Sequence, residues 1–197
     1  MRREKDIIYL ISLRKDCPVR ARMEIDYLSN HRDAIPGIAD WFHNEWSCRC
    51  PDRTRDDFEE IIRTRAISHG IPFALVAVNS SGVIGTVSLK IHDMVVRTGL
   101  GPWLAGLYVD AQWRGRGVGR RLVEAMEKTA AEMGFGEVFL YTSGAEQFYF
   151  RLGWRIMGQR EYCGCPYTLM GRNIAARSRI TDKAEITGRR EEVTVCK

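Results

Sequence analysis

Residues 107–121 read LYVDAQWRGRGVGRR and form the most informative stretch of the sequence. The apolar residues 107–109 are typical of the end of a strand, and glycines at alternate positions then form a tight turn. From Val118 onward apolar residues recur every three or four positions, which predicts an amphipathic helix. The apolar residues of that helix are Val118, Leu122, Met126, Ala130 and Met133. The sequence therefore predicts a strand, a glycine-rich turn and a helix in direct succession.

The glycine-rich turn has the chemistry of an anion site. The first amides of a helix have no intrahelical acceptor, and the helix dipole adds partial positive charge at the same end. Glycines let an anion approach the backbone without a Cβ in the way. Arg114, Arg116 and Arg120 add full positive charges suited to phosphate. We therefore expect a phosphate-bearing ligand at residues 114–120.

Two common phosphate motifs are excluded by the spacing of the glycines. The P-loop pattern G-x-x-x-x-G-K-S/T is absent from this stretch. A dinucleotide fingerprint requires G-x-G-x-x-G, whereas here the glycines are Gly115, Gly117 and Gly119. Taken alone, the stretch is also compatible with a Gly/Arg-rich surface turn before an ordinary helix.

Two segments together resemble the GNAT acyltransferase superfamily. Arg114-x-x-Gly117-x-Gly119 resembles its R/Q-x-x-G-x-G/A pattern, which holds the pyrophosphate of acetyl-CoA. Residues 145–154, AEQFYFRLGW, resemble its A-x-x-F-Y-x-x-L-G-F/W segment, at the expected distance downstream. The resemblance spans about residues 23–174. It implies an acetyl-CoA-dependent N-acetyltransferase that moves an acetyl group directly to a primary amine.

The order of predicted elements agrees with that fold. Alternation and turn signals predict strands at 24–28, 73–78, 83–91, 103–109, 137–142, 154–159 and 167–171. Helical periodicity predicts helices at about 30–46, 54–66, 118–133 and 145–152. We expect Asn30 to cap the first helix, Pro36 to lie in its first turn, and Thr54 with Asp57 to form a capping box before the second. The resemblance implies an α/β (α+β) fold with a mixed, mostly antiparallel sheet, splayed between strands 4 and 5, and helices on both faces.

The resemblance also assigns the cofactor site. The pantetheine arm would lie in the gap between strands 103–109 and 137–142 and pair with main-chain groups of Leu107 and Val109. The implied cofactor-binding residues are Leu107, Tyr108, Val109, Arg114, Gly115, Arg116, Gly117, Val118, Gly119 and Arg120. Many relatives place an asparagine after the fifth strand to contact the pantetheine. Here that loop is Thr142-Ser143-Gly144, so this contact is lost or made by a hydroxyl.

The implied general acid is Tyr149, which would protonate the departing thiolate. A thiol of pKa ~8.5 and a phenol of pKa ~10 are close enough for this transfer. Phe148 and Leu152, four residues apart, make an apolar stripe, and Tyr149 is expected to lie off it. The general base stays open among His92, Asp93, Glu45 and a water chain. The oxyanion would face the backbone N–H near Leu107, as in similar enzymes.

The charge distribution argues against a nucleic-acid partner. The net charge is +5, but residues 1–22 hold seven Lys/Arg against three acidic residues, and residues 175–197 hold six against four. The middle of the chain, 23–174, holds 17 against 18. A nucleic-acid binder carries its basic face on the folded domain. We expect no nucleic acid as a partner.

Other features bound the function further. No apolar run is long enough to span a membrane, and no metal site is expected from the C-x-C pairs Cys48/Cys50 and Cys163/Cys165. We expect a cytoplasmic monomer or homodimer.

The acceptor is open between a small amine, an amino acid, an aminoglycoside-like compound and a peptide N-terminus. Candidates for the wall of its pocket are Trp41, Trp46, Trp103 and Tyr162. The alternative function is a catalytically silent acyl-CoA-binding regulatory module.

We predict that the two ends are dispensable, as an N-terminal extension at 1–22 and a weakly ordered C-terminal tail at 175–197. Both are charged and lack an amphipathic pattern. Deleting residues 1–22, or everything after Ile174, should change the Tm by less than about 2 °C and leave the affinity for CoA unchanged. A large loss of Tm on either deletion would show that the deleted end is an integrated element.

Overall fold

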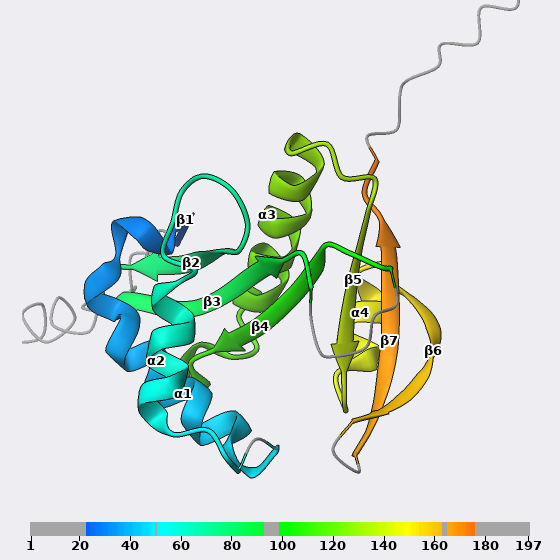
Figure 1. Ribbon diagram of the computed structural model, residues 1–197. Helices are drawn as coiled ribbons and strands as arrows, with labels where there is room; N and C mark the ends of the chain where they lie inside the picture. The colour runs from blue at the N-terminus through cyan, green and yellow to red at the C-terminus, as the bar shows by residue number, and fades with distance from the viewer. Residues whose placement is uncertain (1–22, 50, 93–98, 163–164, 176–197) are drawn as a thin grey trace, which may run out of the picture.

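The computed structural model describes residues 23–49, 51–92, 99–162 and 165–175. Seven strands form one sheet in the order β1-β2-β3-β4-β5-β7-β6 (Figure 1). The strands are β1 (Glu24–Tyr27), β2 (Phe73–Asn79), β3 (Gly82–Lys90), β4 (Trp103–Val109), β5 (Glu137–Thr142), β6 (Arg155–Tyr162) and β7 (Cys165–Asn173). The helices are α1 (Ile35–Trp46), α2 (Arg55–Arg63), α3 (Val118–Glu132) and α4 (Glu146–Arg151). The predicted fold class is confirmed: all neighbouring strands are antiparallel except β4 and β5.

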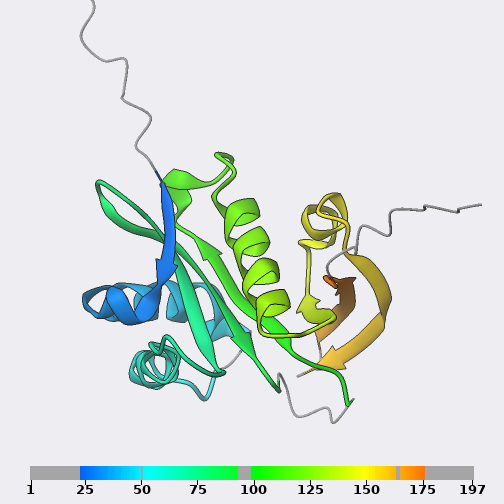
Figure 2. The ribbon, with the colours of Figure 1, turned by 90° about the horizontal axis from the view of Figure 1, so that it is seen from above.

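Helices cover both faces of the sheet, and alternate residues of β2 show why (Figure 2). Phe73, Leu75 and Ala77 join the core beneath α3, whereas Ala74 and Val76 join the core beneath α1 and α2. Successive side chains of a strand point to opposite faces, so a strand that is apolar throughout needs cover on both. Four of the five predicted apolar residues of α3 are buried against the sheet, and each large one contributes about 1.5–3 kcal/mol. The prediction is wrong for Met133, which follows the helix and is 42% exposed.

The sheet opens between β4 and β5. These parallel strands share one register pair, Trp103 with Phe139, and the N–H of Phe139 donates to the carbonyl of Pro102 at 3.0 Å. By contrast β3 pairs with β4, and β5 with β7, along most of their lengths. The two strands therefore lie together where β4 begins and diverge toward its end (Figure 1). The predicted splay between strands 4 and 5 is confirmed.

A β-bulge in β4 lies just before the part of the strand that reaches the site. Thr86 pairs with Tyr108 and Ser88 with Ala105, so Gly106 and Leu107 together oppose one residue of β3. Gly106 has a φ of 60°, and a Cβ there would lie 3.0 Å from Cζ of Phe42. Only glycine meets both constraints without strain. The bulge changes the direction in which residues 107–109 present their main chain, and no pattern in the sequence predicts it.

The starts of two helices test the predicted caps. At α2, Thr54 and Asp57 form the predicted capping box: the Thr54 N–H donates to Asp57 at 2.7 Å, and the Asp57 N–H donates to Thr54 at 3.2 Å. The predicted cap of α1 is wrong. Asn30 lies in a 3₁₀ turn and donates its amide to Asp26 at 3.0 Å, so Ala34 precedes the helix instead. Pro36 lies in the first turn of α1, as expected.

Within the described residues, the structure has no helix both long and apolar enough to cross a membrane.

Candidate functional site

The glycine-rich turn leaves the amide groups at the start of α3 without intrahelical acceptors. The helix begins with Gly117 as its N-cap at a φ of 81°, and Gly115 before it has a φ of 75°. The N–H of Arg121 donates to the carbonyl of Gly117 at 3.1 Å, so the amides of residues 118–120 precede the first hydrogen bond of the helix. Positive φ values explain why glycine stands at both positions. The local geometry is that of an anion site.

A pocket of about 460 Å³ lies at this helix start and continues along the end of β4. Nine of the ten predicted cofactor-binding residues line it, and Arg116 does not. The nine are Leu107, Tyr108, Val109, Arg114, Gly115, Gly117, Val118, Gly119 and Arg120. At Gly119 a Cβ would lie 3.4 Å from Phe148 and 3.6 Å from Val109, so any longer side chain there would project into the pocket.

Other lining residues were not predicted as cofactor contacts. Trp113, Trp46, Ala145 and Phe148 complete the wall together with Glu45, which was predicted as a candidate base. Phe148 and Ala145 belong to the 145–154 segment, so their place in that motif was a usable signal. Thr142 and Ser143, the hydroxyl residues in the place of the usual asparagine, are not among the lining residues.

The three arginines of the turn are held at or beside the mouth of the pocket. Arg114 donates from Nε to the carbonyl of Val109 at 2.9 Å, and its guanidinium lies 5.2 Å from the ring centre of Tyr108. Arg116 lies over the ring of Trp113 at 4.9 Å, and Arg120 donates to Glu124 at 2.7 Å, which raises the pKa of Arg120. Exposed pairs of this kind contribute little to stability. The guanidinium groups can therefore turn to an incoming phosphate at small cost.

Aromatic side chains join α1 to the end of β4. Trp41 stacks on Tyr108 with ring centres 5.2 Å apart, and Trp46 meets the same ring edge-on at 6.4 Å. Of the other predicted wall residues, Trp103 is 1% exposed and belongs to the core, while the side chain of Tyr162 lies outside the described residues. The wall beside the pocket is thus Trp41, Trp46 and Tyr108.

Comparison with known proteins decides the family. The family model described as the acetyltransferase (GNAT) family matches residues 35–154, more than half of the chain. The chain belongs to the GNAT acetyltransferase family. It is accordingly an N-acetyltransferase by family. A search of curated protein sequences finds no match.

Solved structures of GNAT proteins share this fold at low sequence identity. An aminoglycoside 6'-N-acetyltransferase complexed with coenzyme A is 19% identical, with a TM-score of 0.65, 78% of this chain covered and 98% of the other. An aminoglycoside 6'-acetyltransferase type Ii is 23% identical, with a TM-score of 0.62 and coverage of 78% and 99%. The aminoglycoside 6'-N-acetyltransferase from Enterococcus faecium is 19% identical, with a TM-score of 0.60 and coverage of 78% and 98%.

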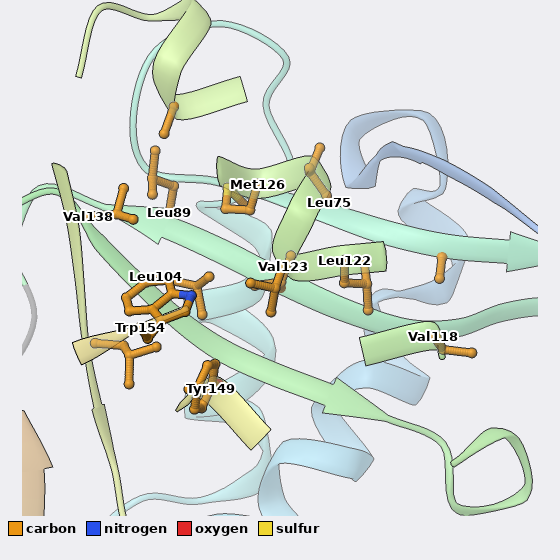
Figure 3. Close-up of a cluster of buried hydrophobic side chains, with 14 of the residues drawn as sticks. Leu75, Leu89, Leu104, Val118, Leu122, Val123, Met126, Val138, Tyr149 and Trp154 are labelled. Carbon is orange, nitrogen blue, oxygen red and sulfur yellow. The ribbon is translucent and has the colours of Figure 1, made fainter. Parts of the chain in front are cut away.

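Tyr149 is the buried residue of α4, so the expectation that it lies off the packed stripe is wrong. It is 7% exposed and packs against Phe148 and Trp154, with ring centres 4.9 Å and 5.8 Å away. Phe148, not Tyr149, lines the pocket. Figure 3 shows Tyr149 and Trp154 within the cluster that α3 buries. Burial also raises the pKa of Tyr149, which moves it further from the pKa of a thiol and makes the phenol a weaker acid than expected from the sequence.

The three candidate bases lie in different places. Glu45, at the end of α1, lines the pocket, and its carboxylate lies 3.8 Å from Nη2 of Arg114. His92 is exposed and follows β3, whose last residue pairs with Trp103 at the start of β4. The pocket lies at the other end of β4, so the structure does not bring His92 to it. Asp93 lies outside the described residues.

No cluster of three or more His, Cys, Asp or Glu side chains suited to a metal ion occurs in the part of the chain that the structure describes. Cys50 and Cys163, one member of each C-x-C pair, lie outside that part.

We predict that Gly119→Glu abolishes binding of acetyl-CoA, because the new side chain would fill the pocket and repel the pyrophosphate. Gly117→Glu should have the same effect, with added strain because of its positive φ. The matched control is Gly37→Glu, on the exposed face of α1 where a Cβ meets nothing within 4 Å. Calorimetry should show lost affinity in the first two variants and unchanged affinity in the control. An unchanged affinity for acetyl-CoA in folded Gly119→Glu would contradict the site. The site would also be contradicted if the affinity of the wild-type protein for acetyl-CoA did not weaken as the salt concentration rises.

Proposed function

We propose that this GNAT protein transfers the acetyl group of acetyl-CoA to a primary amine that enters beside the end of α1. The observation that carries the proposal is the convergence of nine predicted cofactor-binding residues on one pocket. Its other walls come from the end of α1, from Trp113 and from the start of α4. A structural neighbour described as complexed with coenzyme A supports the same co-substrate.

The pocket residues divide between the two ends of the co-substrate. The amides of residues 118–120, together with Arg114 and Arg120, would hold the pyrophosphate. The main chain of Leu107 and Val109, after the bulge, would pair with the pantetheine arm. Gly119 fits this assignment, because its missing side chain leaves room between Val109 and Phe148.

The transfer needs a neutral amine, a stabilised oxyanion and a proton for the leaving thiolate. We assign the oxyanion contact to the backbone N–H near Leu107, because the bulge re-aims the main chain there. The proton that the amine loses would leave through a water chain to solvent. Glu45 stays a candidate base, but its carboxylate lies 3.8 Å from Nη2 of Arg114, at the pyrophosphate end of the pocket. We assign the role of general acid to Tyr149. Because its pKa is raised, the phenol stays neutral; it would first donate a hydrogen bond to the developing thiolate and then transfer the proton.

One wall of the pocket, formed by the end of α1, favours an acceptor with cationic character, whereas Arg114 and Arg120 line the same pocket at the pyrophosphate end. The carboxylate of Glu45 and the half-buried indole of Trp46 line the same cavity. A carboxylate and an aromatic face together favour an ammonium group. The names of three structural neighbours place aminoglycosides first among the compounds to test.

One observation favours the silent acyl-CoA-binding module as the second candidate. Tyr149 is buried behind Phe148 and does not line the pocket. A regulator needs the glycine-rich turn but no acid, so turnover and not binding separates the two functions.

We predict release of free CoA when the protein is given acetyl-CoA and a panel of amines. The panel should include an aminoglycoside, a polyamine, free amino acids and a peptide with a free N-terminus, each scored against hydrolysis without acceptor. At least one amine should raise CoA release at least about tenfold above that background. Tight binding of acetyl-CoA with no release for any amine would contradict the enzyme and favour the regulator.

We predict that Tyr149→Phe lowers kcat by about 10²–10⁴, the usual range for a positioned acid. The change removes one hydroxyl and almost no volume, so packing and cofactor affinity should survive. KM values should change little, because the proton is needed in the transition state and not in the ground state. Phe148→Leu is a poor control, since Phe148 lines the pocket, whereas Phe150→Leu changes an exposed ring of the same helix. Wild-type turnover in Tyr149→Phe would dismiss Tyr149 as the acid.

A further inference from the structure

One buried carboxylate has no part in the transfer chemistry described above. The side chain of Glu127, on α3, is 12% exposed, and burial raises its pKa while Arg172 and Trp154 counteract that shift. A carboxylate is costly to bury unless donors satisfy it. Glu127 has two: the indole N–H of Trp154 donates at 2.8 Å, and Nε of Arg172 donates at 2.8 Å.

Both donors belong to the part of the molecule beyond the splay. Arg172 lies on β7 and Trp154 follows α4, whereas Glu127 lies on the helix that covers β2–β4. Arg172 also donates from Nη1 to the carbonyl of Leu152, the residue that ends α4. The carboxylate thus ties the C-terminal end of α4 to α3, across two sheet halves that share one β4–β5 register pair.

The same contacts reach Tyr149. The main-chain N–H of Trp154 donates to the main-chain carbonyl of Tyr149 at 3.1 Å, and the centres of the two aromatic rings lie 5.8 Å apart. Trp154 is 1% exposed, and Glu127 accepts the hydrogen bond of its buried indole N–H. The phenol of Tyr149 is held by packing, which makes its place depend on Trp154.

We propose that Glu127 is a positioning residue for the transfer step, which fixes α4 and Tyr149 relative to the turn that holds the pyrophosphate. The proposal rests on the proposed function. α3 carries the turn at its first residues and Glu127 eight residues after Gly119, about 12 Å along a rigid helix. The helix thereby sets the distance between the phosphate end of the co-substrate and the group that acts on its sulfur.

Glu127→Gln tests the proposal, because an amide can accept from one of the two donors but must turn its own N–H₂ toward the other. We expect kcat to fall about tenfold while the KM for acetyl-CoA stays within about twofold, since the turn itself is untouched. Glu132→Gln is the matched control: the same change on the same helix at an exposed pair with Lys128, with no effect on kcat. An unchanged kcat in Glu127→Gln would overturn the proposal.

A double-mutant cycle with Tyr149→Phe shows whether Glu127 acts through the phenol. We expect the two substitutions to be non-additive, so that Glu127→Gln lowers kcat by less than about twofold in the Tyr149→Phe background. Additive effects would overturn the proposal. If Tyr149→Phe alone has wild-type turnover, the assignment of Tyr149 as the acid fails. Any fall in kcat in Glu127→Gln must then arise without Tyr149, and this result also overturns the proposal.

A second variant separates positioning from stability. Glu127→Leu combined with Arg172→Met removes the buried charge pair but leaves the indole N–H of Trp154 without its acceptor, so we expect a Tm somewhat below that of the wild type. A purely structural role predicts a wild-type kcat at temperatures where this variant is folded. Positioning predicts a kcat still about tenfold low, because the hydrogen bonds to Trp154 and Leu152 are gone. Recovery of kcat would overturn the proposal even if Glu127→Gln alone fails to fold.

Discussion

The opening in the sheet exists because β4 and β5 share a single register pair, Trp103 with Phe139. Two parallel strands that paired along their full length would close the sheet and satisfy their main-chain groups on each other. Here β4 pairs with β5 only where it begins, and a bulge at Gly106 and Leu107 re-aims its second half. The opening therefore comes from backbone geometry, and the pocket at the end of β4 follows from it.

Helix α3 gives this open sheet its rigidity. Its apolar face packs on β2–β4, its first amides face the pocket, and Glu127 anchors the half of the molecule beyond the splay. A helix is stiff along its axis, so these three attachments keep fixed distances from one another. The arginines of the turn add charge at the mouth of the pocket without entering the core.

The sequence was informative where chemistry is local and uninformative where it depends on packing. The turn at 114–119, the stripe of α3 and the Thr54 capping box are set by residues close in sequence, and each could be predicted. The bulge at Gly106 could not, because it depends on the ring of Phe42 from another element. The spacing of Phe148 and Leu152 predicted that Tyr149 lies off their apolar stripe. In the structure Tyr149 packs against Trp154 within the cluster beneath α3, and this packing is not encoded by local spacing. The wrong cap at Asn30 is an exception, because the hydrogen bond that Asn30 donates to Asp26 is also local, between residues four apart in sequence.

A crystal structure of the complex with CoA would show whether the gap between β4 and β5 and the start of α3 together form the co-substrate site. The account predicts pyrophosphate oxygens about 3 Å from the amides of residues 118–120. It also predicts a pantetheine arm paired with the main chain of Leu107 and Val109, its sulfur directed toward α4. CoA bound elsewhere, or bound at the turn with the arm outside the gap, would contradict it.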